Sequence, residues 1–108
     1  MRKILLVEDE DAVRNITLDM LQLLGHEVQA TVDGIEALAA LQAASFDILI
    51  TDLGLPGVSG VAVAEAARRL HPAIHIVIAS GQAKIDNAPA DAVLLKPYNF
   101  ASLQAVLP

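Results

Sequence analysis

The amino-acid sequence predicts one α/β domain built on a doubly wound, five-stranded parallel sheet. Short apolar runs without polar interruption recur along the chain, a pattern typical of strands that are covered on both faces. Segments with helical periodicity lie between them, and this alternation favours parallel strands joined by crossover helices. A chain of 108 residues, 55% of them hydrophobic, can bury one core but is short for two ordinary domains. We therefore expect a single domain over residues 1–108.

Five segments are expected to be strands. The first, residues 4–7, is apolar at every position and is followed at once by a run of acidic residues. Residues 27–31 form a weaker candidate that would suit an edge of the sheet. The remaining three candidates are the apolar runs at residues 46–50, 74–79 and 92–95.

Four helices are expected between and after these strands. The first spans residues 11–24 and is followed by Gly25, a residue that commonly ends helices. Residues 35–44 and 61–70 form the next two, and the last spans residues 99–107. Their predicted apolar stripes are Val13, Ile16, Met20, Leu21 and Leu24 in the first helix, Ala37, Leu38 and Leu41 in the second, and Leu103, Val106 and Leu107 in the last.

The composition argues against several classes of function. A net charge of −6 is unfavourable for direct nucleic-acid binding, which depends on neutralising phosphates with Lys and Arg. The chain has no cysteine, so disulfides, thiolate metal sites and cysteine nucleophiles are excluded, and a reducing compartment is the simplest location. No window approaches the roughly 18 uninterrupted apolar residues of a membrane-spanning helix. We expect a soluble, cytoplasmic protein without a membrane or nucleic-acid partner.

Polar side chains follow the predicted strands at the points where the strands end. Glu8 and Asp9 follow the first strand, Asp52 the third, Ser80 the fourth and Lys96 the fifth. Because ligands of doubly wound sheets bind at the carboxyl ends of the strands, we expect these side chains to converge. Adjacent carboxylates repel one another unless a cation shares their site. Oxygen donors without histidine or thiolate are suited to Mg²⁺.

Four blocks at these strand ends resemble the receiver domain of two-component response regulators, and the resemblance covers essentially the whole chain. The blocks are Leu5-Leu6-Val7-Glu8-Asp9, Thr51-Asp52-Leu53-Gly54-Leu55-Pro56-Gly57-Val58-Ser59-Gly60, Ala79-Ser80-Gly81 and Leu95-Lys96-Pro97-Tyr98. The resemblance implies a flavodoxin-like (βα)5 fold. It also implies a domain that accepts a phosphoryl group from a histidine kinase or a histidine phosphotransfer protein and signals to a downstream protein effector. Such a domain assists its own phosphotransfer and dephosphorylation but is not an enzyme in the ordinary sense.

The resemblance further implies which residues form the phosphoryl and metal site. Asp52 would be the phosphorylated aspartate. Glu8 and Asp9 would be the acidic pair that holds Mg²⁺, together with Asp52 and the backbone carbonyl of Gly54.

Two further residues have implied roles, and the chain also departs from the family pattern. Ser80 would donate its hydroxyl to the phosphoryl group, Lys96 would pair with Asp52, and the Lys96-Pro97 bond is expected to be cis.

Ser80 and Lys96 are closer in sequence than is usual, and residues 82–90 have little apolar periodicity, so we expect the fourth helix to be shortened or absent. Val93 stands where receivers commonly have an aromatic switch, so signalling would depend on Ser80 and loop motion.

Other functional classes match the sequence less well. A phosphohydrolase with an aspartyl-phosphate needs a second carboxylate two residues after Asp52, where this chain has Gly54. A flavin or dinucleotide module needs glycines after the first strand, where this chain has acids. His26, His71 and His75 are expected at the surface and not in a metal site. One alternative stays open, a pseudo-receiver that binds proteins without regulated phosphorylation.

Overall fold

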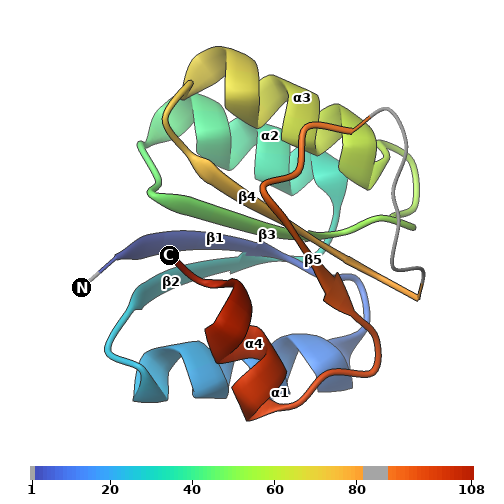
Figure 1. Ribbon diagram of the computed structural model, residues 1–108. Helices are drawn as coiled ribbons and strands as arrows, with labels where there is room; N and C mark the ends of the chain where they lie inside the picture. Colours follow the sequence, from blue (N-terminus) through green and yellow to red (C-terminus); the bar gives the residue numbers. More distant parts are fainter. Residues whose placement is uncertain (1, 82–87) are drawn as a thin grey trace.

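Five parallel strands form one central sheet in the order β2-β1-β3-β4-β5 (Figure 1). The structure, a computed structural model, describes residues 2–81 and 88–108. The strands are β1 (Lys3–Val7), β2 (Glu27–Thr31), β3 (Ile48–Asp52), β4 (His75–Ser80) and β5 (Ala92–Leu95). The predicted doubly wound parallel sheet is confirmed. The strand order reverses between β1 and β3, which is where such folds bind their ligands.

Four helices in the described residues cover the two faces of the sheet. Helices α2 (Gly34–Ala43) and α3 (Gly60–Leu70) lie on one face, and α1 (Asp11–Leu23) and α4 (Phe100–Val106) lie on the other (Figure 1). No helix joins β4 to β5 among the described residues, in agreement with the shortened fourth helix, although residues 82–87 of that connection lie outside them. None of the described helices combines the length and the apolar character needed to span a membrane.

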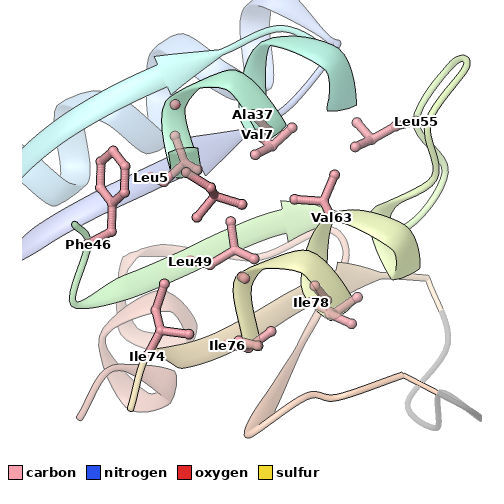
Figure 2. Close-up of a cluster of buried hydrophobic side chains, with 14 residues drawn as sticks. Leu5, Val7, Ala37, Phe46, Leu49, Leu55, Val63, Ile74, Ile76 and Ile78 are labelled. Carbon is pink, nitrogen blue, oxygen red and sulfur yellow. The ribbon is translucent and has the colours of Figure 1, made fainter. Parts of the chain in front are cut away.

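The apolar runs of the strands are buried on both faces, as the sequence pattern indicated. Successive side chains of a strand point to opposite faces, so Leu5 and Val7 of β1 face α2 and α3, whereas Ile4 and Leu6 join the core beneath α1 and α4. Figure 2 shows the first of these two cores. Its buried members are Leu5, Val7, Ala37, Ala40, Leu41, Phe46, Leu49, Leu55, Val63, Ala64, Ala67, Ile74, Ile76 and Ile78. The second comprises Ile4, Leu6, Leu21, Ile48, Ile50, Val77, Ala79, Leu94 and Leu103.

The predicted element boundaries are close to the observed ones, with one larger shift. Strand β3 begins at Ile48 instead of residue 46, because the Asp47 carboxylate accepts a hydrogen bond from the Lys3 backbone N–H at 2.8 Å, just before the ladder. The helix stop at Gly25 is confirmed, since this residue has φ 88°, a conformation that glycine adopts without strain. Side chains cap three helices at their N-termini, namely Asp33 for α2, Ser59 for α3 and Asn99 for α4.

The predicted apolar stripe of α1 was wrong at one position. Ile16 is 59% exposed, whereas the neighbouring Thr17 is fully buried. The polar Thr17 can be buried because its hydroxyl makes a 2.6 Å hydrogen bond to the hydroxyl of Tyr98, at the start of the segment that leads into α4. A buried hydroxyl with a partner costs little, whereas one without a partner is costly. This contact joins α1 to the C-terminal end of the chain.

The Asp91 carboxylate, just before β5, is hydrogen-bonded to β4 and to α3. Its carboxylate accepts hydrogen bonds from the Ile76 backbone N–H at 2.8 Å and from the Arg68 guanidinium at 2.7 Å. Arg68 also donates to the carbonyls of Pro72 and Ile74, each at 3.0 Å. Burial acts to raise the pKa of Asp91, but the Ile76 N–H and the Arg68 charge outweigh it and hold this pKa below its ordinary value of 3.8.

We predict that Thr17 and Tyr98 are coupled in stability. Tyr98→Phe should lower the free energy of unfolding by about 1 kcal/mol or more, because it leaves a buried hydroxyl without its partner. Urea unfolding of Tyr98→Phe, Thr17→Val and the double variant should give a coupling free energy of about 1 kcal/mol. If the loss in free energy of unfolding of the double variant equals the sum of the two single losses, the prediction is wrong.

We also predict that Asp91 makes folding stability depend on acid pH. A carboxyl whose pKa is lowered by folding stabilises the protein above its unfolded pKa, and this contribution is lost as the pH falls through the folded value. The difference in free energy of unfolding between wild type and Asp91→Asn should therefore be constant near neutral pH and shrink below about pH 5. Asp19→Asn, an exposed change on α1, is the control and should show no such trend. A difference that does not change with pH would refute the prediction.

Candidate functional site

Three carboxylates meet at the carboxyl edge of the sheet, as the sequence predicted. Glu8 and Asp9 directly follow β1, and Asp52 is the last residue of β3, the neighbouring strand. One carboxylate oxygen from each lies within 4.8 Å of the others. Glu8 is only 2% exposed, Asp52 is half-buried and Asp9 is exposed. The cluster thus has a buried side and a side that is open to solvent.

Lys96 reaches this cluster from the end of β5. Its Nζ donates to Oε1 of Glu8 at 2.9 Å and lies 3.3 Å from Oδ2 of Asp52. The ion pair with Asp52 was expected, but the shorter one with Glu8 was not. The peptide bond from Lys96 to Pro97 is cis, as expected. In the described part of the chain, Lys96 is the cation that pairs with both carboxylates.

The electrostatics of the cluster favour an additional positive charge. Burial raises the pKa of Glu8, and the hydrogen bond and charge of Lys96 offset this effect only in part. For Lys96, burial acts to lower the pKa, but Glu8 and Asp52 outweigh it, so the pKa of Lys96 is raised and the ammonium form is retained. Three carboxylates and one ammonium group leave an excess of negative charge at a partly buried position. A cation bound there would lower the cost of burying Glu8.

The donor atoms of the cluster are those that a hard divalent cation prefers. Glu8, Asp9 and Asp52 offer carboxylate oxygens, and Gly54 lies two residues beyond Asp52 in the exposed loop before α3. Mg²⁺ typically binds through one or two carboxylates and retains several waters. The residues present therefore fit Mg²⁺.

Ser80 lies in β4, the strand next to β3, and Val93 lies in β5, on the far side of β4. Ser80 is the last residue of β4, is buried, and follows Ala79, which is paired with Asp52 in the parallel ladder. The backbone carbonyl of Ser80 accepts a 2.7 Å hydrogen bond from the backbone N–H of Lys96. Val93 in β5 pairs with Ile78 and is half-buried. The structure thus brings the side chains of Glu8, Asp9, Asp52 and Lys96 together and places the backbone of Ser80 at the end of the adjacent strand.

The backbone of Asp52 is held by residues whose importance the sequence did not reveal. A Cβ atom on Gly60 would lie 2.1 Å from the Asp52 carbonyl oxygen, so only glycine allows α3 to start this close to the end of β3. The buried Thr51 hydroxyl donates to the same carbonyl at 3.0 Å. The sequence signal that could have identified Gly60 is its place directly after Ser59, the residue that caps α3.

Comparison with known proteins places this site in a family. A family model described as the response regulator receiver domain matches residues 4–107. The response regulator receiver protein CpdR of Brucella abortus (strain 2308) is 32% identical over 109 residues, which cover 95% of this chain and 91% of CpdR. Other curated relatives are much longer, and the chain spans only 11% of one of them, a sensor kinase.

Two solved structures extend the likeness to the fold. Chemotaxis response regulator CheY4 of Vibrio cholerae is 31% identical, with a TM-score of 0.89 over 99% of each chain. The receiver domain of sensor histidine kinase PA1611 from Pseudomonas aeruginosa PAO1 is 26% identical, with a TM-score of 0.87 over 97% of this chain and 93% of that one. The PA1611 structure contains a magnesium ion coordinated in its active-site cleft. With its topology and strand-end cluster, the chain belongs to the family of response regulator receiver domains, which accept phosphoryl groups in two-component signalling.

Proposed function

We propose that Asp52 is the residue of this domain that accepts the phosphoryl group. The observation that carries the proposal is the position of its carboxylate, which is half-buried at the end of β3, within 4.8 Å of Glu8 and Asp9 and 3.3 Å from the Lys96 ammonium. A carboxylate is a weak nucleophile, so it must stay ionised and be held in position to react. The Lys96 ammonium, 3.3 Å from Oδ2 of Asp52, would help to hold this carboxylate in position.

Mg²⁺ is the cofactor that we propose for this reaction. Glu8, Asp9 and Asp52 would hold the ion through their carboxylates, and the backbone carbonyl of Gly54 would be a further ligand. The donor set and the raised pKa of the buried Glu8 both support this assignment. When bound, the ion would neutralise negative charge on the carboxylates and on the oxygens of the incoming phosphoryl group.

The chain's own residues would position and neutralise the reacting groups. A carboxylate oxygen of Asp52 forms the new bond to phosphorus as the phosphorus–nitrogen bond of a phosphohistidine breaks, and the histidine nitrogen keeps the electron pair. Lys96 would orient Asp52 before transfer and then pair with a phosphoryl oxygen. Ser80, at the end of the adjacent strand, would donate its hydroxyl to another phosphoryl oxygen. Catalysis of this kind needs positioning and charge neutralisation more than covalent chemistry.

Partners follow from this chemistry. Receiver domains interact with histidine kinases, and we infer that a histidine kinase or a histidine phosphotransfer protein is the phosphodonor here. This domain would act in the cytoplasm, with a downstream protein effector as the recipient of the signal. Residues 1–108 would act together as the receiver domain. The acidic chain, with a net charge of −6, is unsuited to bind nucleic acid directly. A pseudo-receiver would have no need of the carboxylate cluster and its paired lysine.

We predict that phosphorylation depends on both Asp52 and Mg²⁺. Incubation with acetyl phosphate and Mg²⁺ should add one phosphoryl group to the wild type, measured by intact-protein mass spectrometry. Asp52→Asn and chelation of Mg²⁺ should each abolish this addition, whereas Asp19→Asn, an exposed change on α1, should not. If the wild type gains no phosphoryl group under these conditions, the pseudo-receiver alternative is correct.

We predict that Lys96 is needed for transfer but not for metal binding. Lys96→Ala should slow phosphorylation of Asp52 by about a hundredfold, the usual effect of removing a group that stabilises developing charge. Its affinity for Mg²⁺ in calorimetric titration should be unchanged or higher, because a competing positive charge is removed from Glu8. Lys3→Ala, at the opposite end of β1, is the matched control. Weaker Mg²⁺ binding by Lys96→Ala would contradict this division of roles.

A further inference from the structure

The turn between β1 and α1 carries two of the proposed metal ligands, and its geometry decides where they point. Glu8 and Asp9 are consecutive residues in this turn, and α1 begins at Asp11. Within the described residues, Glu10 at the N-cap of α1 makes no side-chain capping hydrogen bond. Caps ordinarily fix the entry of a chain into a helix. The Glu10 backbone N–H donates to Oε2 of Glu8 at 3.1 Å, and beyond this bond the turn needs another means of being held.

Arg14 supplies that means from the first turns of α1. One guanidinium nitrogen donates to the backbone carbonyl oxygen of Glu8 at 3.0 Å, and the other pairs with the carboxylate of Asp11. The Arg14 side chain is only 15% exposed, whereas that of Asp11 is 84% exposed. The fork of the guanidinium thus joins Glu8, the first residue of the turn, to Asp11, the first residue of the helix. A planar group with several donors in fixed directions restricts geometry in a way that a single ammonium does not.

The described hydrogen bonds of Arg14 go to groups other than the proposed ligand carboxylates. Its positive charge lies among the acidic residues that follow β1, yet its guanidinium bonds to the backbone carbonyl of Glu8 and to the carboxylate of Asp11, which is outside the proposed ligand set. The Glu8 backbone is held on its other side as well, because its N–H donates to the Thr31 carbonyl at 3.1 Å. Arg14 and Thr31 together clamp the peptide groups on both sides of the Glu8 Cα. This clamp holds the Glu8 backbone, while the Glu8 carboxylate itself accepts hydrogen bonds from the Glu10 backbone N–H at 3.1 Å and from Lys96 at 2.9 Å.

We propose that Arg14 is a positioning residue for the cation site, acting through the Glu8 carbonyl to hold Glu8 and Asp9 in the geometry that Mg²⁺ requires. The proposal rests on the proposed function, because it assumes that these carboxylates bind Mg²⁺. Mg²⁺ demands near-ideal octahedral geometry, whereas Ca²⁺ accepts irregular and variable coordination. Loosening the turn should therefore weaken Mg²⁺ binding more than Ca²⁺ binding.

The test is calorimetric titration of the full chain with MgCl2 and separately with CaCl2. Arg14→Gln removes the charge and the fork, and Arg14→Lys keeps the charge but offers a single ammonium. We expect Arg14→Gln to weaken Mg²⁺ binding by about tenfold, the range typical of residues that orient metal ligands. Arg14→Lys should be intermediate, and both variants should lose less affinity for Ca²⁺ than for Mg²⁺. Arg69→Gln, an exposed change at the end of α3, should behave as wild type.

Four outcomes would overturn the proposal. Tighter Mg²⁺ binding by Arg14→Gln with unchanged binding by Arg14→Lys would mean that Arg14 acts by charge alone. Equal losses for Mg²⁺ and Ca²⁺, accompanied by lower unfolding midpoints in metal-free buffer, would mean a general structural role. Wild-type Mg²⁺ binding by both variants would refute the inference but leave the proposed function intact, whereas failure of the wild type itself to bind Mg²⁺ would refute the proposed cofactor as well.

Discussion

The ion pair between Glu8 and Lys96 is the interaction on which the site depends. It joins residues 88 positions apart in sequence, and β3 and β4 lie between the strands that carry them. Burying the Glu8 carboxylate without a partner would be strongly unfavourable, since an unpaired buried charge costs several kcal/mol even after relaxation. Because Lys96 spans the sheet edge to reach Glu8, its ammonium passes beside Asp52, which lies between them on β3. One ion pair thus stabilises Glu8 and orients Lys96 toward Asp52.

The two apolar cores keep these strand ends in register. Strands β1, β3 and β4 are buried along nearly their whole length, so they cannot slide past one another without exposing apolar side chains to water. The polar groups at the ends of these strands are therefore held in fixed relative positions. Gly60 adds to it locally, because the missing side chain lets α3 begin against the Asp52 carbonyl. The stability of the two packed cores offsets the unfavourable excess of negative charge at the sheet edge.

Local sequence patterns predicted the elements and the acidic cluster well, for a physical reason. Apolar runs identify buried parallel strands, and the carboxyl ends of parallel strands share one edge, so Glu8, Asp9 and Asp52 could be expected to meet without knowing the strand order. Contacts between distant side chains have no such local signature. The Thr17–Tyr98 bond, 81 positions apart, determines which face of α1 is buried and explains the error at Ile16. The Glu8–Lys96 pair and the Arg14 clamp escaped prediction for the same reason, since each depends on the direction of a long side chain.

Lys96 and the residues that follow it are hydrogen-bonded to two other elements of the domain. Its backbone N–H is bonded to the Ser80 carbonyl at 2.7 Å, and Tyr98, two residues further on, is bonded to Thr17 of α1. Val93, which occupies the place of the family's aromatic switch, is an aliphatic residue held in the β5 ladder opposite Ile78. It has no ring that could swing between a buried and an exposed position. These hydrogen bonds therefore couple the position of Lys96 to the end of β4 through Ser80 and to α1 through Tyr98.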